Sequence, residues 1–495
     1  MNTDCNSGRI ELQGPGNRTI VADFNGGTIT SDGGALLLQE ADRKSRLIKR
    51  LAKCFLDARD PSRTEHTVEE LLRQRILAIA LGYEDLDDHD QLRVDPLLAT
   101  VVGKIDVTGE SRARERDRGA ALAGKSTLCR LDHALKDFTE PKSGQAEPDN
   151  EPQAEPDDEP RAEDRYHKIT ADREAIERFF VETFLDAFEE MPERIVLDFD
   201  ATDNLIHGEQ EGRFYHGYYG HYCYLPLYVF CERYVLCAKL RPSNIDAAEG
   251  SLEVLQDLVA AIRERWPEVE ILVRADSGFT RDAFMTWCDE NRVDYVLGLA
   301  KNSRLREMLE PAFETLEKAL EESEESKGRE FAELRYKTRT SWSRERRVVG
   351  KAEITVGGRN PRFVVTSLSE EEIAAKPLYE DLYCARGEME NRIKEQQLDL
   401  FSSRTSSHWM RANQMRLWFS AVAHLLFEEI RRLSLEETEL ATARCETIRL
   451  KLFKIGTLVR VTVRKIWFSF SSAYAYRKLF SRILRRLRGP DPSPA

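Results

Sequence analysis

The stretch RIVLDFDATD, residues 194–203, decides the fold, because it predicts a buried β-strand that ends in carboxylates. Its Asp198 and Asp200 are two residues apart, so both side chains lie on the same face of the strand. A second apolar strand, ILVRAD, ends at Asp276. Open α/β sheets display catalytic groups at the ends of their strands, but a single aspartate there is more often a turn or cap residue. The aspartates therefore need a third group before they predict chemistry.

The segments around these two strands predict a mixed sheet with helices packed on it. LPLYVFCERYVLCAKL (225–240) predicts two strands joined by a tight turn, and residues 248–265 predict an amphipathic helix. After Asp276 come a helix and the strand VDYVLGLA (293–300). This order of elements is that of an RNase H-like α/β fold, and we expect its first part to cover residues 167–302.

Residues 303–374 break the pattern. A charged helix gives way to alternating strand-like stretches, which predict a β-rich insertion into the core. A long helical stretch then runs from Leu378 through Ile430, just after Pro377. We expect residues 375–435 to form the second part of the core.

The third group lies on that helix. In LYEDLYCARGEMENRIKEQQLDLF (378–401), Tyr383, Arg386 and Glu390 have the spacing i, i+3, i+7, which stacks them on one stripe that Lys394 and Gln397 extend. A charged stripe is usually a solvated face. This mixture fits a phosphate-handling site better, because Glu can hold a metal ion while Arg and Lys can hold phosphate.

Residues 1–140 predict a mostly helical N-terminal domain. Two short strands are expected around Ile10–Leu12 and Thr19–Phe24, and Thr67 is expected to cap a helix that ends at Gly82. Two interpretations stay open, a plain helical domain or a helix-turn-helix-like domain that binds DNA ends. Residues 141–166 are acidic, rich in proline and without aromatic residues before Tyr166, which predicts a disordered linker.

The formal net charge of -13 argues against a nucleic-acid partner until its distribution is considered. A DNA-binding protein needs positive charge only where phosphates lie. The linker carries much of the negative charge, whereas residues 441–490 hold thirteen Lys or Arg and one Glu. In the basic C-terminal region, 436–495, apolar and basic residues alternate. That pattern is compatible with a strand on a β layer, with a phosphate-contacting face, or with both.

The cysteines and apolar segments exclude several classes of protein. The nine cysteines form no C-x-x-C pair, which argues against a zinc ribbon or disulfide framework and favours buried thiols in a reducing compartment. No signal peptide and no apolar segment of membrane-spanning length are recognisable. We expect a cytoplasmic, nucleoid-associated protein without a membrane partner.

Five pieces of the sequence carry a specific resemblance. They are FNGGTITSDGGALLLQEAD (24–42), DATDNLIHGEQEGRFYHGYYGHYCYLPLYVF (200–230), VRADSGF (273–279), YVLGLAKNSRL (295–305) and ENRIKEQQLDLF (390–401). Together they resemble the bacterial insertion-sequence transposases with a DDE catalytic domain, in the subgroup called transposase DDE domain group 1.

The resemblance implies roles for individual residues. DATD is similar to the D-x-T of the first catalytic strand, which implies Asp200 as a catalytic residue, with Asp198 as a rival or helping metal ligand. RADSGF implies Asp276. The Y-x2-R-x3-E-x6-K signature matches Tyr383, Arg386 and Glu390 but has Gln397 where lysine is expected, and Lys394 is one turn earlier.

The same resemblance implies a DNA transposase that binds terminal inverted repeats and performs cut-and-paste transposition. Asp200, Asp276 and Glu390 would hold two Mg²⁺ ions, for which Mn²⁺ can substitute. The expected partners are double-stranded DNA at element ends and target, and a second copy of the chain in a synaptic complex. The alternatives are an RNase H-like host nuclease and a non-catalytic DNA-binding protein descended from a transposase.

Two further groups of residues have open interpretations. Trp342, with Arg344 and Arg346 beside it, either stacks an unpaired base or is a core tryptophan next to a solvated basic strand. Such insertions in related transposases go with a DNA hairpin at the element end. His207, His216 and His221 allow zinc, but their Gly- and Tyr-rich surroundings favour a loop that contacts DNA.

Overall fold

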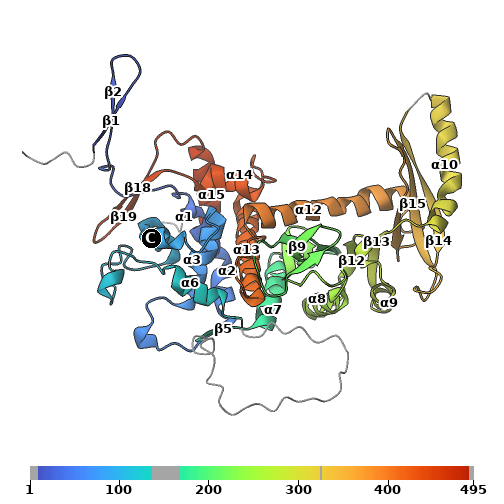
Figure 1. Ribbon diagram of the computed structural model, residues 1–495, viewed down its shortest axis with the longest axis horizontal. Helices are drawn as coiled ribbons and strands as arrows, with labels where there is room; N and C mark the ends of the chain where they lie inside the picture. Colours follow the sequence, from blue (N-terminus) through green and yellow to red (C-terminus); the bar gives the residue numbers. More distant parts are fainter. Residues whose placement is uncertain (1–8, 136–167, 324–325, 490–495) are drawn as a thin grey trace, which may run out of the picture. The chain divides into compact units, whose positions relative to one another are not determined.

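The computed structural model describes residues 9–135, 168–323 and 326–489, so the predicted linker at 141–166 lies outside the described residues. The chain divides into two compact units (Figure 1). Unit 1 contains Met1–Ile48, Asp60–Cys129 and Glu429–Ala495, and unit 2 contains Lys49–Arg59 and Arg130–Glu428. None of the described helices is both long and apolar enough to cross a membrane.

Unit 2 is built on a mixed sheet, as predicted. Within the described residues the sheet has nine strands in the order β11-β10-β6-β12-β13-β17-β15-β14, with β16 paired to β15. The strands are β6 (Arg194–Ala201), β10 (Leu227–Cys231), β11 (Tyr234–Lys239), β12 (Glu270–Ala275), β13 (Val293–Leu299), β14 (Gly328–Tyr336), β15 (Arg346–Thr355), β16 (Gly358–Arg359) and β17 (Arg362–Thr366). Strands β6, β12 and β13 are parallel to one another, and the other pairings are antiparallel.

The segment predicted as a β-rich insertion extends this sheet instead of interrupting it. Strand β17 pairs antiparallel with β13, from Val296 opposite Thr366 to Leu299 opposite Phe363. Buried side chains from both sides of this seam form one cluster, because Leu272, Val296, Val349 and Val364 pack with Leu368, Leu378 and Tyr379. The apolar strands therefore find their burial against the core strands, and the hydrophobic core is continuous across the seam.

Four helices of unit 2 lie against the sheet. They are α7 (Arg173–Leu185), α8 (Ser251–Arg265), α9 (Asp282–Glu290) and α10 (Ser303–Ser323). Helix α7 packs on β11 and α8, α9 packs on β13, and α10 packs on β14 and β15 (Figure 1). Two small sheets complete the unit. One pairs β4 (Phe55–Asp57) with β5 (Ile169–Ala171), and the other contains β7 (Asn204–Leu205), β8 (Phe214–His216) and β9 (His221–Tyr224).

The helical stretch expected from 378 to 430 is broken once. It comprises α11 (Ala375–Pro377), the π-helical turn η5 (Leu378–Tyr383), the 3₁₀ turn η6 (Cys384–Arg386), α12 (Gly387–Lys394), the π-helical turn η7 (Glu395–Asp399) and, after a gap, α13 (Met410–Ile430). Phe401 in the gap has a φ of 60°. Short polar side chains explain the break, since they bond to nearby backbone in competition with a helix. Asn413, for example, bonds to both backbone groups of Ser407.

Unit 1 is mostly helical, with short strands from both ends of the chain. The helices in it or at its borders are α1 (Ala35–Ser45), α2 (Leu47–Ala52), α3 (Val68–Leu81), α4 (His89–Leu92), α5 (Pro96–Val102), α6 (Lys125–Asp132), α14 (Cys445–Ile448) and α15 (Arg477–Arg488). The strands are β1 (Ile10–Gln13), β2 (Thr19–Ala22), β3 (Ile29–Thr30), β18 (Thr457–Val461) and β19 (Ile466–Phe470). As predicted, Thr67 caps α3, in a capping box with Glu70, and Gly82 ends it with a φ of 96°.

The basic C-terminal region folds with the N-terminal region, although the sequence predicted two separate regions at 1–140 and 436–495. Strand β18 pairs with β3 as well as with β19. The buried carboxylate of Asp32 binds Lys454 Nζ at 2.6 Å and accepts a hydrogen bond from the Tyr83 hydroxyl at 2.6 Å. Arg449 donates to the Ala80 carbonyl oxygen at 2.8 Å, near the end of α3. The two ends of the chain thus share one core.

Candidate active site at the carboxyl ends of β6 and β12

Asp200 and Asp276 are brought together by the pairing of two parallel strands. Ala275, the last residue of β12, lies opposite Phe199 of β6. The residues that follow them, Asp276 and Asp200, therefore reach the same edge of the sheet. Asp276 begins the 3₁₀ turn η4 (Ser277–Phe279), and its carboxylate accepts a hydrogen bond from the Gly278 backbone at 2.8 Å. The two aspartates predicted from separate strands are therefore neighbours.

Arg386 joins Asp200 to Glu390. Its Nη1 atom is 3.2 Å from Asp200 Oδ2, and its Nη2 atom is 3.2 Å from Glu390 Oε1. The stripe predicted from the i, i+3, i+7 spacing therefore faces the carboxyl edge of the sheet. Asp200 and Arg386 are mostly buried, with 15% and 16% of their side chains exposed, whereas half of the Glu390 side chain is exposed.

The electrostatics of the cluster favour a bound cation. Burial raises the pKa of Asp200 to about 6, Arg386 opposes the rise, and the neighbouring carboxylates of Asp276 and Glu390 add to it. Carboxylates that repel one another and offer hard oxygen ligands form a site that fits a divalent cation. Within the described residues, the oxygens of the three carboxylates are not all within 4.8 Å of one another, and Arg386 lies between Asp200 and Glu390.

A family model, transposase DDE domain group 1, matches residues 13–491. The chain belongs to the DDE transposases. No curated protein matches this transposase. Among solved structures, a cryo-EM structure of the piggyBac transposase synaptic complex with hairpin DNA is similar to it at 12% identity and a TM-score of 0.38, over 94% of this chain and 83% of that one. A likeness this low supports no conclusion about the transposase.

Asp198, the predicted rival of Asp200, is a partner of Arg274 in this transposase. Arg274 Nε and Nη2 each donate to one oxygen of Asp198 at 2.7 Å, and both residues are buried. Arg274 Nη1 also donates to the Leu382 carbonyl oxygen at 2.8 Å. The ion pair therefore fastens β6 to β12 and to the turn that leads into the Arg386 stripe. Because Arg274 engages both oxygens of Asp198, this geometry favours Asp200 as the direct metal ligand and Asp198 in the helping role that was its predicted alternative.

Gly298 is a site residue that sequence reasoning missed. A Cβ atom at this position would lie 2.6 Å from the Tyr383 hydroxyl and 2.9 Å from the Ser277 backbone nitrogen. Only glycine lets the β13 backbone come this close to both. The signal in the sequence was an isolated glycine inside an apolar strand, which often marks a close approach of another group.

Gln397, which stands where the family signature has lysine, holds the loop that follows Asp200. Its Nε2 atom donates to the Asp203 carbonyl oxygen at 2.9 Å and to Asn204 Oδ1 at 3.0 Å. Lys394, the predicted substitute, is exposed. The amide of Gln397 thus tethers η7 to the loop that follows Asp200.

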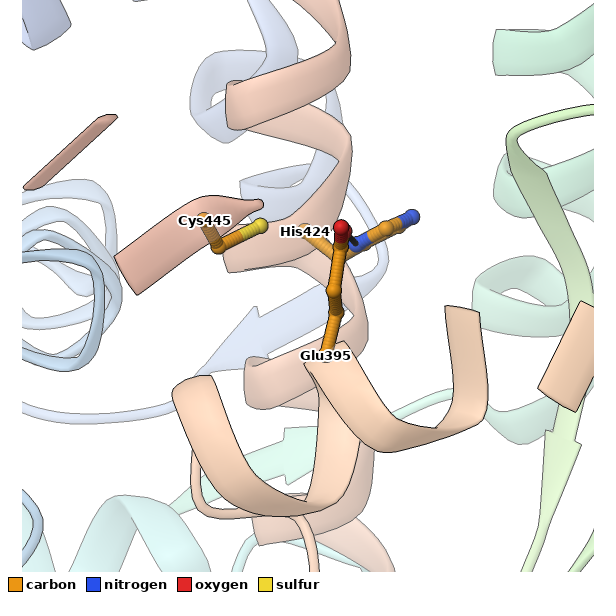
Figure 2. Close-up of side chains that lie close together, drawn as sticks. All are labelled: Glu395, His424 and Cys445. Atoms are coloured by element: carbon orange, nitrogen blue, oxygen red, sulfur yellow. Dashed lines mark ion pairs between the residues drawn. The ribbon is translucent and has the colours of Figure 1, made fainter. Parts of the chain in front are cut away.

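After Glu390 in the sequence, the helical run is anchored by a buried pair of side chains, Glu395 and His424. Figure 2 shows the side chains of Glu395 and His424 pointing toward each other. His424 Nδ1 is 3.8 Å from Glu395 Oε2, and His424 Nε2 is 3.0 Å from the Arg233 carbonyl oxygen. These contacts connect η7 with α13 and the turn between β10 and β11, and so fix the helical run that carries Glu390.

The predicted DNA-contacting residues of β15 and the loop before it have structural partners instead. Trp342 is 5% exposed and packs edge-on against Tyr336, with ring centroids 5.6 Å apart. Arg346 is buried, pairs with Asp289 and donates to the Tyr295 hydroxyl at 2.8 Å. Arg344, more than half exposed, also pairs with Asp289, at 2.5 Å. The core-tryptophan alternative therefore fits this structure, and base stacking by Trp342 does not.

The histidines expected to mark either zinc or DNA contact lie around β8 and β9. Within the described residues, no metal-binding group contains His207, His216 or His221. His221 Nε2 instead lies 2.7 Å from Asp203 Oδ2, in the loop after Asp200. The zinc alternative thus has no ligand set around these residues.

Proposed function

We propose that this DNA transposase cuts and joins DNA strands at the carboxyl edge of its sheet, with divalent metal held by Asp200, Asp276 and Glu390. The observation that carries the proposal is the meeting of Asp200 and Asp276 at adjacent strand ends, with Arg386 linking Asp200 to Glu390. We propose Mg²⁺ as the natural ion, with Mn²⁺ able to replace it, because all the donors are hard oxygens.

Each side chain has a distinct task in this proposal. The three carboxylates would hold two ions, which supply activation of the attacking oxygen and stabilisation of the leaving oxygen when bound. Arg386 would position the carboxylates of Asp200 and Glu390, and Arg386 and Tyr383 would bond a phosphate oxygen, since guanidinium and phosphate match in geometry. Lys394, exposed on the same helical run, adds positive charge for the DNA backbone.

The strand arrangement supports an RNase H-like core. Strand β6 pairs antiparallel with β10, which pairs with β11, while β12 and β13 run parallel to β6. This is the order inferred for that fold from the sequence. Its strand ends carry the proposed catalytic carboxylates.

We further propose that the partners are the terminal inverted repeats of a bacterial insertion sequence and its target DNA, on nucleoid DNA in the cytoplasm, with two copies of the chain in the synaptic complex. Support for DNA contact by unit 1 comes from the β18–β19 hairpin, where Arg460, Arg464 and Lys465 are exposed. From Thr457 to Arg460 in β18 the side chains alternate between buried and exposed, so one face packs while the other can meet phosphates.

The test is strand cleavage by the full chain on duplexes that carry the DNA flanking its gene. We expect nicking that requires Mg²⁺ or Mn²⁺ and falls on the order of 1,000-fold or more in Asp276→Asn and Glu390→Gln. DNA binding without metal should persist in both variants. The matched control is Glu270→Gln, because Glu270 is an exposed carboxylate at the opposite end of the same strand, β12.

The outcomes separate the alternatives. If the wild-type chain binds these duplexes but never cuts them with any divalent metal, it is a non-catalytic DNA-binding protein. If it cuts DNA of any sequence equally, without preference for the flanking repeats, a host nuclease is the better description. If Asp276→Asn cuts as fast as the wild type, the proposed carboxylate site is wrong.

A further inference from the structure

A surface of exposed aromatic rings lies beside the proposed active site. We call residues 213–222, which comprise Arg213, β8, the turn after it and the first two residues of β9, the aromatic hairpin. Phe214, Tyr215, Tyr218 and Tyr222 are exposed by 42%, 59%, 87% and 45%. Several exposed aromatic rings on one short segment indicate a site of interaction, because leaving them in water is unfavourable.

The rings of the aromatic hairpin form two groups, because Tyr222 and His221 are neighbours in β9 and point to opposite faces, and within each group the rings contact one another. Tyr215 lies directly opposite Tyr222 in the β8–β9 register, and their ring centroids are 5.7 Å apart. In the turn, Tyr219 has the Tyr218 ring at 5.1 Å and the His216 ring at 4.8 Å. The rings are therefore ordered before anything binds, which lowers the entropic cost of binding.

Two contacts fix the aromatic hairpin next to Asp200. His221 bonds Asp203 at 2.7 Å, three residues after Asp200, and Gln397 holds the backbone of Asp203. The Tyr219 ring lies near this contact, with its centroid 6.1 Å from that of the His221 ring. The aromatic hairpin thus lies next to the strand end that carries Asp200.

The charge on the aromatic hairpin indicates which form of DNA it fits. Its one basic side chain, Arg213, has its guanidinium 4.7 Å from the Tyr222 ring and lies 3.7 Å from Glu209. Duplex DNA presents phosphates outward and hides the faces of its bases, so a duplex surface needs several unpaired cations. Unpaired bases present their faces, and stacking on tyrosine tolerates any base.

We propose that the aromatic hairpin binds the unpaired bases of a DNA end by stacking, while the adjacent carboxylate edge acts on the backbone. The proposal rests on the proposed function and adds the form of DNA that the site prefers, an end with separated strands. Tyr218, the most exposed ring, and Tyr222, which lies against Arg213, are the residues that we expect to contact bases.

The experiment compares two duplexes of one arbitrary sequence, one blunt and one with three unpaired nucleotides at a single end, in buffer without divalent metal. The unpaired end carries 2-aminopurine, whose fluorescence falls when it stacks. We expect wild-type protein to bind the unpaired end more tightly and to quench the 2-aminopurine. In Tyr218→Ala/Tyr222→Ala the preference should fall on the order of 5- to 100-fold for each stacked base lost, with blunt-duplex affinity unchanged.

The matched control is Tyr218→Phe/Tyr222→Phe, which keeps the rings and should keep both the preference and the quenching. Equal binding of the two duplexes by the wild type would overturn the proposal, as would alanine and phenylalanine variants that behave alike. If the alanine variant instead converts a dimer into a monomer in light scattering, the surface joins two copies of the chain and the proposal is wrong.

Failure of this proposal differs from failure of the proposed function. A wild-type chain that cuts DNA with Mg²⁺ but shows no preference for unpaired ends overturns only the role of the aromatic hairpin. A wild-type chain that binds neither these duplexes nor those that carry the DNA flanking its gene overturns both. Because the substituted rings are exposed, thermal unfolding of the variants should match that of the wild type and shows whether each variant is folded.

Discussion

At the scale of single residues, the surroundings of Asp200 alter its acid–base chemistry. Burial and two neighbouring carboxylates raise its pKa to about 6, although Arg386 opposes them. The folded chain therefore holds a proton on Asp200 more tightly than the unfolded chain does. This stabilisation is fully present below the ordinary pKa of 3.8 and is lost as the pH rises through about 6.

The same pKa predicts how metal binding depends on pH. A carboxylate must lose its proton to hold a metal ion, so affinity for Mn²⁺ should be constant above about pH 7 and about tenfold weaker at pH 5. Calorimetric titration at pH 5, 6 and 7 measures this. Asp200→Asn should bind more weakly and lose the pH dependence, whereas Glu270→Gln should keep it. A flat profile in the wild type would mean that Asp200 is not a ligand.

Which residues belong to the site could be predicted where the reason is local. The spacing of Tyr383, Arg386 and Glu390 follows from helical geometry alone, and the structure shows Arg386 between Asp200 and Glu390. The choice between Asp198 and Asp200 could not be made, since both lie on one face of β6. Their difference depends on Arg274, whose place opposite Asp198 is set by the register of β12.

At the scale of elements, the lack of a side chain at Gly298 allows β13 to pack closely against the turn η5. The Tyr383 hydroxyl oxygen and the Ser277 nitrogen lie too close to leave room for a Cβ atom at Gly298. Ser277 follows Asp276 directly, so any shift of this backbone moves a proposed metal ligand. The π-helical turn that ends at Tyr383 adds an irregular geometry of the kind often found at functional sites.

We expect Gly298→Ala to lower stability by about 1–3 kcal/mol and to lower cleavage further, because the added methyl group overpacks the site. Tyr383→Phe in the same chain removes the hydroxyl and should recover part of the stability, but the contact with Ser277 remains. Gly387→Ala is the control, since nothing lies within 4 Å of its Cβ position. Thermal unfolding and the nicking assay measure both effects. Equal stability of Gly298→Ala and Gly387→Ala would contradict the packing argument.

The elements themselves were predicted with uneven success, for a physical reason. Strands β6 and β12 and helix α3 follow from local patterns and caps, and they lie where the sequence placed them. The pairing of β17 with β13 joins residues about 70 apart and depends on packing, so the segment 303–374 looked like an insertion. The break in the helical run after Asp399 depends on hydrogen bonds from side chains to the backbone, which the spacing of apolar residues does not reveal.

At the scale of the whole molecule, the largest difference from the sequence prediction is that unit 1 contains both ends of the described chain. Local patterns cannot reveal a pairing between β3 and β18, which are more than 400 residues apart. The glycines of the FNGGTITSDGG motif (24–34) were the available signal. A Cβ atom at Gly34 would lie 1.8 Å from the Leu452 carbonyl oxygen, so this residue marks the contact between the two ends.

We therefore expect Gly34→Ala to destabilise unit 1 selectively, by about 3 kcal/mol or more, because the clash is with backbone atoms that cannot rotate away. Amide hydrogen exchange should show lost protection in α3, which belongs to the same unit, while β6 and β12 of unit 2 stay protected. Gly456→Ala is the matched control, since the space around Gly456 is open. If α3 keeps its protection in Gly34→Ala, the two ends of the chain do not stabilise each other. If β6 and β12 lose protection together with α3, the two units unfold as one.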